Sequence, residues 1–465
     1  MIEKDVVIVG GGLVGSLLAT MLAKRGHEVT VFERRSGRSG AGKSAGRSIN
    51  LVVTRRGLEA LRLVGLDRPV LDLTVSVRGR MMHSSSGDLS YQPYGRDESE
   101  CNYSISRSGL NAFLVDRARE EGADFVFDHE LTGGDPETGI LHFKDCSSGA
   151  SVEVKAGVVF GTDGAFSALR ASFRKYAGFE DSIEWLEHGY KEFLIPPGPN
   201  GEFQLEKNAL HIWPRGEFML MALPNLDASF TGTFYLRNEG DPSFESLGGT
   251  ATQAPSEVRR LFERNFPDFV SLVPDFEDQF FANPTGTLGT VRCYPWHCGS
   301  RFLLLGDAAH AVVPFFGQGM NTGFEDCTLL IRLLEENGEG EWGDVFRDLS
   351  ERRKRHADAI AAMAIENFSE MREKVGDKTF LLRKAVEHRL EEVMPEIYRS
   401  RYSMVMFSSI PFADAQDVGA IQDEIIATIC AGIDSAEDVD LQNARVLIEN
   451  RLSPFLRSRN ISLDY

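Results

Sequence analysis

One stretch of the chain places a carboxylate close to a glycine-rich helix start. A short apolar run, Phe302 to Leu305, predicts a strand buried on both faces, and Asp307 follows at its carboxyl end, where open α/β sheets hold ligands. Gly317, Gly319 and Asn321 then precede a helical pattern. A carboxylate can hydrogen-bond a polyol, and a helix N-terminus stabilises an anion. A flavin needs both groups, but an ordinary strand–turn–helix corner fits this stretch equally well.

The N-terminal residues show the dinucleotide-binding pattern in the context that it requires. The apolar strand Val6 to Val9 is followed by Gly10, Gly12 and Gly15, then by a helix and a second strand that ends at Glu33. The glycines allow the backbone to approach a pyrophosphate at the helix N-terminus. Glu33 is placed to accept hydrogen bonds from an adenosine ribose, so we predict that this unit binds a dinucleotide.

The two residues after Glu33 leave the identity of that dinucleotide open. Arg34 and Arg35 could bind a ribose phosphate, which makes NADP the rival of FAD as the ligand of this unit. The chain has a single pattern of this kind. If it binds FAD, a nicotinamide cofactor has to bind transiently elsewhere.

Two further positions could contact a large ligand that crosses several strand ends. Asp163 follows the apolar strand Val158 to Gly161, although a simple turn is the ordinary interpretation of an acid–glycine corner. Arg107 precedes a helix predicted from Leu110 to Glu120, where it either faces the cofactor or is exposed at the helix start.

A predicted hairpin carries candidate residues for binding a carboxylate. Its strands are Val77 to His83 and Leu89 to Tyr94, and it includes Arg78 and Arg80. A regular strand places residues two positions apart on the same face, so the pattern does not choose between the two arginines.

The remaining elements predict an α/β protein. It has a Rossmann-like FAD-binding domain with a parallel sheet, an inserted antiparallel β-sheet substrate domain, and a C-terminal helical region. The predicted boundaries are 1–75, 104–178 and 285–370 for the first domain, 76–103 and 179–284 for the second, and 371–465 for the helical region. Residues 36–47 are rich in Gly, Ser and Arg, which predicts a loop.

Composition excludes several classes of function. The 465 residues include 50 Lys plus Arg and 69 Asp plus Glu, a formal charge of −19, which argues against a nucleic-acid or anionic-membrane partner. The six cysteines form no Cys-x-x-Cys pair and no cluster with zinc spacing, so we expect reduced thiols, a cytoplasmic protein and no metal. No apolar run is long enough to predict a membrane span.

The order of three motifs resembles that of the single-component flavin-dependent aromatic hydroxylases. The motifs are GGGLVG at Gly10, GTDG at Gly161 and GDAAH at Gly306. Less common strings make the chain similar to the branch of this family that hydroxylates L-kynurenine. These strings are RSINL at Arg47, RGRM at Arg78, QPYGRD at Gln92, HGYKE at His188, NALHIWP at Asn208, PTG at Pro284, PFFGQGMN at Pro314 and RYSMVMF at Arg401.

The resemblance implies a reaction and a set of binding residues. Non-covalent FAD, reduced by NADPH as a transient co-substrate, would capture O2 as a hydroperoxide and hydroxylate L-kynurenine to 3-hydroxy-L-kynurenine, with no catalytic side chain of the protein required. The implied substrate-binding residues are Arg80, Tyr94, Asn367 and Tyr402. The predicted cofactor-binding residues are Gly10, Gly12, Leu13, Gly15, Glu33, Arg34, Arg35, Val52, Arg107, Leu131, Asp163, Asp307, Gly319, Met320 and Asn321.

The chain departs from the family pattern in two places, and other functions stay open. Phe316 stands where some relatives carry His, which puts a proton relay at that position in doubt, and a C-terminal hydrophobic anchor is missing. We therefore expect the soluble bacterial type of this family, with a homodimer as a possible assembly. Residues 418–465 add nothing to the resemblance. The alternatives are a hydroxylase of another aromatic acid or amino acid, a flavin-dependent reductase, and a non-catalytic FAD-bound module.

Overall fold

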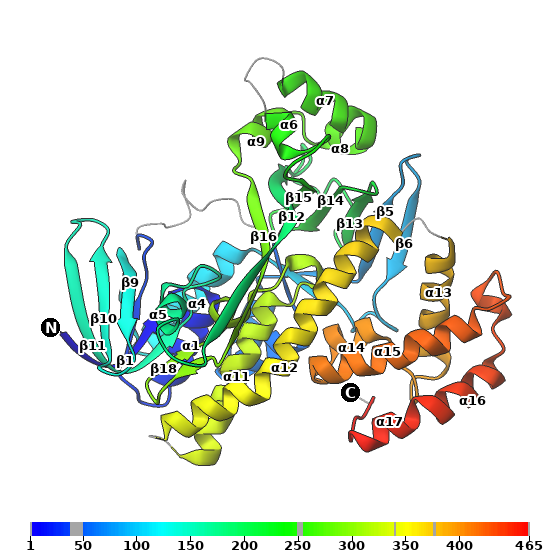
Figure 1. The fold of residues 1–465 in the computed structure, drawn as a ribbon. Helices are drawn as coiled ribbons and strands as arrows, with labels where there is room; N and C mark the ends of the chain where they lie inside the picture. Colours follow the sequence, from blue (N-terminus) through cyan, green and yellow to red (C-terminus); the bar gives the residue numbers. More distant parts are fainter. Residues whose placement is uncertain (1, 38–49, 249–253, 339–340, 375–377, 464–465) are drawn as a thin grey trace. The chain divides into compact units, whose positions relative to one another are not determined.

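The computed structural model describes residues 2–37, 50–248, 254–338, 341–374 and 378–463. The chain forms two compact units, and it passes between them several times (Figure 1). The first unit consists of Met1–Thr74, Ile105–Leu186 and Leu288–Ala361. The second consists of Val75–Ser104, Glu187–Thr287 and Ala362–Tyr465.

The first unit is built on a mixed sheet whose central strands are parallel. Its order is β17 (His297–Cys298), β18 (Phe302–Leu304), β11 (Ser151–Gly161), β1 (Ile2–Val9), β2 (Val29–Phe32) and β8 (Asp124–Val126). Val6–Val9 of β1 and the whole of β2 and β18 are buried, and they are apolar except for Thr30. An antiparallel hairpin of β9 (His129–Asp135) and β10 (Ile140–Asp145) extends from β11.

The carboxyl ends of the parallel strands lead into the elements that form the candidate cofactor site. β1 is followed by α1 (Leu13–Ala23), β11 by α5 (Ala168–Phe173), and β18 by the short α10 (Asp307–His310). The other elements of this unit that bear on the site are β3 (Leu51–Val53), α2 (Arg55–Arg62), α4 (Arg107–Glu120), the 3-10 turn η1 (Pro314–Phe316) and α11 (Gly319–Asn337). α12 (Trp342–Ser369) begins in the first unit and ends in the second.

The second unit contains most of a largely antiparallel sheet with an aromatic core, of which residues 180–186 and 288–294 belong to the first unit. The strand order is β16 (Gly286–Tyr294), β12 (Glu180–Ile195), β15 (Phe230–Arg237), β14 (Met219–Pro224), β13 (Ala209–Pro214), β5 (Gly79–His83) and β6 (Leu89–Pro93). Helices α6 (Phe244–Gly248), α7 (Ala254–Asn265), α8 (Pro267–Leu272) and α9 (Phe276–Ala282) supply phenylalanines to this core. Phe262, for example, stacks on Phe276 with ring centres 5.0 Å apart.

The second unit also contains the C-terminal helices and a short strand pair. After α12 the chain forms a π-helical turn, Glu370–Lys374, and then α13 (Lys378–Val393), α14 (Arg401–Phe407), α15 (Phe412–Ile429), α16 (Leu441–Arg451) and α17 (Ser453–Ser458). β4 (Val75–Val77) pairs antiparallel with β7 (Asn102–Ile105), and Val77 lies opposite Asn102.

The predicted fold class is confirmed, and the differences are local. The first helix begins at Leu13 instead of Ser16 because the chain turns into the helix directly after Gly12, whose carbonyl accepts the N–H of Ser16. The sequence did not indicate that β13 and β5 pair in parallel. The loop predicted over residues 36–47 lies outside the described residues from residue 38 onward.

Candidate functional site

The turn between β1 and α1 can be built only with glycine at two positions. Gly10 has a φ of +102°, in the region that favours glycine. A Cβ on Gly15 would lie 2.0 Å from the carbonyl oxygen of Gly10, whereas a Cβ on Gly12 would meet no atom within 4 Å. The turn is therefore tightly packed between Gly10 and Gly15 and open at Gly12. A turn that receives a phosphate group requires such an open position. Leu13 is the first residue of α1.

Glu33 is a buried carboxylate directly beside this turn. Its Oε2 accepts the N–H of Gly11 at 2.8 Å, and Arg35 donates to Oε1 through both its backbone N–H and its Nε. Burial by itself raises the pKa of Glu33, but the hydrogen bonds and charge of Arg35 outweigh it and keep the pKa below its ordinary value. The structure therefore pairs Glu33 with Arg35, which the sequence indicated as two separate contacts for the dinucleotide.

The corner after β11 supports the glycine turn from the neighbouring strand. The Thr162 hydroxyl donates to the carbonyls of Val9 and Gly10 at 3.0 and 2.8 Å. Asp163 is half-buried, and its Oδ2 accepts the N–H of Leu169 at the start of α5. Its Oδ1 has no hydrogen-bond partner among the residues that the structure describes. Burial raises the pKa of Asp163.

The corner after β18 places Asp307 beside the start of α11. Gly306 turns the chain with a φ of +57°, and Asp307 begins α10. A Cβ on Gly319 would lie 4.0 Å from Asp307 Oδ1. No hydrogen bond or ion pair to Asp307 exists within the described part of the chain, so its carboxylate is available next to a helix N-terminus.

The side chain of Asn321 binds this helix start to β3. Its Nδ2 donates to the carbonyls of Val52 and Gly317 at 2.8 and 2.9 Å, and its Oδ1 accepts the N–H of Thr54 at 3.0 Å. Asn321 is fully buried. Its amide group therefore positions Val52 and the helix start, which leaves the backbone as the part of Asn321 that could contact a cofactor.

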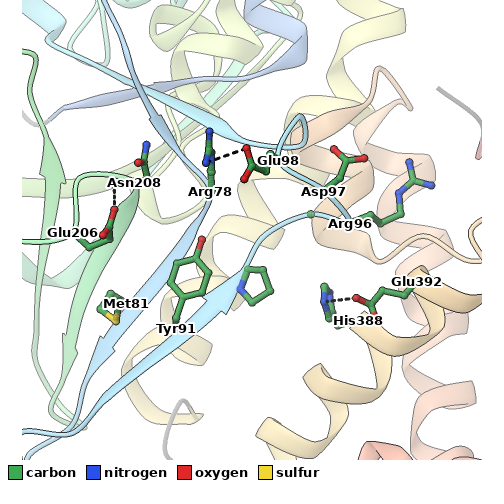
Figure 2. A pocket seen from close by; sticks show the side chains of 12 residues that line it. Arg78, Met81, Tyr91, Arg96, Asp97, Glu98, Glu206, Asn208, His388 and Glu392 are labelled. Carbon is green, nitrogen blue, oxygen red and sulfur yellow. Dashed lines mark hydrogen bonds and ion pairs between the residues drawn. The ribbon is translucent and has the colours of Figure 1, made fainter.

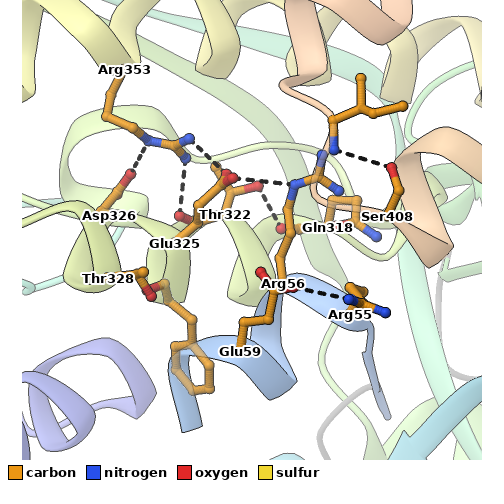
Figure 3. Close-up of polar contacts among 12 residues, drawn as sticks. Arg55, Arg56, Glu59, Gln318, Thr322, Glu325, Asp326, Thr328, Arg353 and Ser408 are labelled. Atoms are coloured by element: carbon orange, nitrogen blue, oxygen red, sulfur yellow. Dashed lines mark hydrogen bonds and ion pairs between the residues drawn. The ribbon is translucent and has the colours of Figure 1, made fainter. Parts of the chain in front are cut away.

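A buried charged network contacts Gly306, the residue before Asp307, and it was not predicted from the sequence. Figure 3 shows its residues Arg56, Glu325, Asp326 and Arg353. Asp326 accepts the N–H of Gly306 at 3.0 Å, contacts His310 Nε2 at 2.6 Å and accepts Arg353 Nε at 2.8 Å. Arg353 also donates to Glu325, which pairs with Arg56 at 3.3 Å. Burial alone raises the pKa of Asp326, but His310 and Arg353 outweigh it and lower the pKa.

The other predicted cofactor residues differ in their surroundings. Arg34 and Arg107 are exposed, and Arg107 is the first residue of α4, whose N-cap is Ser106. Leu131 is buried on β9 opposite Phe143. Met320 is buried in the first turn of α11. The buried Phe316 ends η1, and its apolar ring cannot carry a proton.

In the second unit, three of the four predicted substrate-binding residues form one cluster. The ring of Tyr94 stacks on that of Tyr402, with centres 5.2 Å apart and 22° between the planes. The guanidinium carbon of Arg80 lies 5.5 Å from the Tyr94 ring centre and 5.2 Å from the Tyr402 ring centre. Burial raises the pKa of both phenols. The cluster therefore combines a cation with neutral hydroxyl donors, which suits a carboxylate ligand.

The structure separates Arg78 from Arg80, which the sequence pattern could not do. The backbone pairing of β5 continues through Arg78, whose N–H donates to the carbonyl of Asn208 and whose carbonyl accepts the N–H of Tyr94. Its side chain, however, lines an open pocket of about 610 Å³ and pairs with Glu98 at 3.2 Å (Figure 2). Of the two arginines, Arg80 is the one that lies against the tyrosines.

The fourth predicted residue, Asn367, is buried on α12, where its Nδ2 donates to Met371 Sδ at 3.5 Å. Another asparagine of the second unit, Asn102, was missed, yet its Nδ2 donates to the Tyr402 hydroxyl at 3.1 Å. Its position as the first residue of the short strand β7 gave no local signal of this contact.

Two kinds of feature are absent from the described residues. They contain no group of His, Cys, Asp and Glu residues that could hold a metal ion. Nor does any helix in the described ranges have the length and apolarity needed to cross a membrane. Open glycine backbone, buried carboxylates and an Arg–Tyr cluster are suited to hold a dinucleotide and an amino acid.

Comparisons with known proteins identify a family that the chain is similar to over most of its length. A model of the FAD binding domain matches residues 3–215 and 252–364. The chain is 49% identical over 457 residues to the kynurenine 3-monooxygenase of Myxococcus xanthus, covering 98% of this chain and 97% of that protein. It is 40% identical over 467 residues to the kynurenine 3-monooxygenase of Dictyostelium discoideum, covering 97% and 99%.

Solved structures with low sequence identity share the fold. The tetrameric form of 2-methyl-3-hydroxypyridine-5-carboxylic acid oxygenase matches with a TM-score of 0.63 at 20% identity, over 85% of this chain and 98% of that one. The p-nitrophenol 4-monooxygenase of Pseudomonas putida matches with a TM-score of 0.61 at 18% identity, over 92% and 98%. At this identity the likeness concerns the fold alone.

Proposed function

The chain belongs to the kynurenine 3-monooxygenase family of FAD-binding proteins, and we propose that it hydroxylates L-kynurenine to 3-hydroxy-L-kynurenine with FAD, NADPH and O2. The observation that carries the proposal is the similarity to the family over nearly the whole chain. The Arg80–Tyr94–Tyr402 cluster supports it, because the family's substrate is an amino acid and this cluster suits a carboxylate.

The residues of the first unit fit FAD. The glycine turn is open at Gly12, where a pyrophosphate can approach the N-terminus of α1. Glu33 is a buried acceptor for a ribose, and Asp307 is an unpaired carboxylate for the ribityl hydroxyls. When bound, FAD supplies the redox chemistry that passes electrons from NADPH to O2. We therefore propose that the first unit is the cofactor domain and the second the substrate domain.

The residues of the second unit would bind and orient the substrate. Arg80 can donate two parallel hydrogen bonds to the carboxylate, which also determines the direction of the aromatic ring. Tyr94 and Tyr402 can donate a further hydrogen bond without ionising, because burial raises the pKa of both. Orientation of this kind lowers the barrier by restricting the substrate to a reactive geometry.

The identity of the reaction can be tested by product analysis under labelled oxygen. Purified protein with L-kynurenine, NADPH and ¹⁸O2 should form hydroxykynurenine that contains one labelled oxygen atom. A product without label, or NADPH oxidation without any oxygenated product, would favour a flavin-dependent reductase. Label in another aromatic acid, with none in kynurenine, would favour a related hydroxylase.

A second measurement tests control by the substrate. Under anaerobic conditions NADPH should reduce the flavin slowly alone and faster with L-kynurenine, because a protein with one dinucleotide unit binds NADPH only transiently. Equal rates would contradict control by the substrate.

A cytoplasmic location is also proposed, and it is supported by cysteines that are all free and lie in the described part of the chain. Possible assembly as a homodimer stays a prediction.

A further inference from the structure

Asn102 contacts the predicted substrate-binding cluster from an element that the sequence did not connect with it. It is the first residue of β7, it is only 3% exposed, and its Nδ2 donates to the Tyr402 hydroxyl at 3.1 Å. An amide buried at this depth requires partners for both its nitrogen and its oxygen.

A buried ion pair holds the two contacting residues in place. Arg399, fully buried, contacts Glu100 Oε1 at 2.8 Å. Ser400 then caps α14, the helix that carries Tyr402, and its backbone N–H donates to Glu391. Asn102 and Tyr402 therefore each follow closely after a member of one ion pair, which restricts their relative movement.

The donors of this cluster follow from the chemistry of its side chains. Asn102 Nδ2 donates to the Tyr402 hydroxyl at 3.1 Å. A guanidinium carries only N–H donors, so Arg80, which lies against both rings, can only donate. Burial raises the pKa of both phenols, so each keeps an O–H group that can donate to a ligand.

The cluster leaves an acceptor as well as a donor unused. Asn102 Oδ1 is buried and has no hydrogen-bond partner among the residues that the structure describes. Arg80 Nε is likewise buried and, within the same described part of the chain, unpartnered. An unmet buried acceptor destabilises a protein by about 1–3 kcal/mol, so a ligand that satisfies it gains affinity. A donor set for an anion beside an acceptor for a cation matches the two charged groups of an α-amino acid.

We propose that Asn102 is a substrate-binding residue whose Oδ1 accepts a hydrogen bond from the α-ammonium group of the amino acid held by Arg80 and Tyr94, while its Nδ2 positions the Tyr402 hydroxyl. This inference rests on the proposed function and adds a specificity determinant to it. A carboxylate alone would satisfy Arg80 and Tyr94, whereas only a ligand with both charges would also satisfy Asn102.

The test compares two ligands in the FAD-bound protein without NADPH, using calorimetry to measure Kd. L-kynurenine is compared with its desamino analogue, which keeps the carboxylate and the aromatic ketone. A hydrogen bond to a charged group contributes about 1.5–3 kcal/mol, so wild type should prefer L-kynurenine about tenfold to hundredfold. In Asn102→Leu this preference should fall to about threefold or less. Asn102→Asp keeps an acceptor oxygen and should retain the preference.

Two controls separate the proposal from structural damage. Asn208→Leu alters another asparagine of the second unit, whose Nδ2 donates to the carbonyl of Ser76, and it should keep the wild-type preference. The flavin spectrum and melting temperature report whether Asn102→Leu is folded and loaded with FAD. If it is not, Asn102→Ser is measured in the same way.

The possible results are distinct. An unchanged preference in the folded Asn102 variant, even with both ligands bound more weakly, would show that Asn102 only supports Tyr402 and would overturn the proposal. Failure of wild type to bind L-kynurenine at all would overturn the proposed function, and this inference with it.

Discussion

The guanidinium carbon of Arg80 lies 5.2 Å from the centre of the Tyr402 ring. This contact brings together strand β5 and helix α14, which are far apart in the sequence. Arg80 also lies over Tyr94, whose ring stacks on that of Tyr402. The neighbouring Arg78 is directed elsewhere, with a side chain 42% exposed and paired with Glu98. Two arginines two residues apart therefore offer a matched pair of substitutions.

Arg80→Met should raise KM for L-kynurenine by more than about tenfold while the protein still binds FAD. Removal of the cation leaves a buried substrate carboxylate unpaired, which weakens binding by about 2–5 kcal/mol. Arg80→Lys should restore only part of the loss, since an ammonium group lacks the fork of a guanidinium. Steady-state kinetics measure the effect. Arg78→Met is the control, and an equal increase in KM for both methionine variants would remove Arg80 from the site.

Asp307→Ala should weaken FAD binding about tenfold to hundredfold. Its carboxylate would accept charge-assisted hydrogen bonds from the ribityl chain, each contributing about 1.5–3 kcal/mol. The measurement is the Kd for FAD, from flavin fluorescence during titration of the stripped protein. Asp344→Ala removes an exposed carboxylate that pairs with Arg347 and should keep wild-type affinity. Asp307 would have no role in FAD binding if both variants retained the flavin like wild type.

Arg353→Met should destabilise the first unit by about 3–5 kcal/mol, because it leaves Asp326 and Glu325 without their buried cation. Arg352→Met changes the preceding residue, which is 51% exposed and makes longer ion pairs with Asp348 and Glu336, so it should lower stability by at most about 1 kcal/mol. Thermal unfolding of the two variants checks the difference. Equal melting temperatures would show that the buried network does not stabilise the unit.

The second unit should lose stability as the pH falls from about 6.5 to 4. His211 is buried, its Nε2 donates to the carbonyl of Glu206 at 2.9 Å, and burial lowers its pKa from an ordinary value of 6.5 to about 4. Between these values the unfolded chain binds a proton that the folded chain does not. Stability therefore decreases towards acid pH, by up to about 3 kcal/mol for this residue.

The contribution of His211 can be isolated with two variants studied by urea unfolding across this pH range. His211→Gln should reduce the slope of stability against pH, whatever its effect at pH 7. The exposed His142 on β10 supplies the control, and His142→Gln should leave the slope unchanged. If His211→Gln keeps the wild-type slope, the acid sensitivity arises from other groups.

The sequence alone was sufficient for features that depend on local backbone geometry and on periodicity. The spacing of Gly10, Gly12 and Gly15 predicted the glycine turn, and the structure gives the reason, because a Cβ on Gly10 or Gly15 would meet backbone atoms. The apolar run Val6–Val9 predicted a strand of the parallel sheet. The acid at the end of β2 and the turn at Gly306 belong to the same class of local signal. The resemblance to a family, carried by such strings, predicted the cofactor and substrate together.

Tertiary structure alone decided which distant side chains meet. Regular alternation made Arg78 and Arg80 equivalent, and only the contacts of their side chains in the folded chain separated them. The contact of Asn102 with Tyr402, and of Asp326 with Gly306 and Arg353, depend on how segments far apart in the sequence pack. No periodic pattern encodes such pairs, because each partner by itself is an ordinary polar residue in an ordinary element. Their roles arise from burial, which removes water and leaves each polar group dependent on the neighbour that the fold provides.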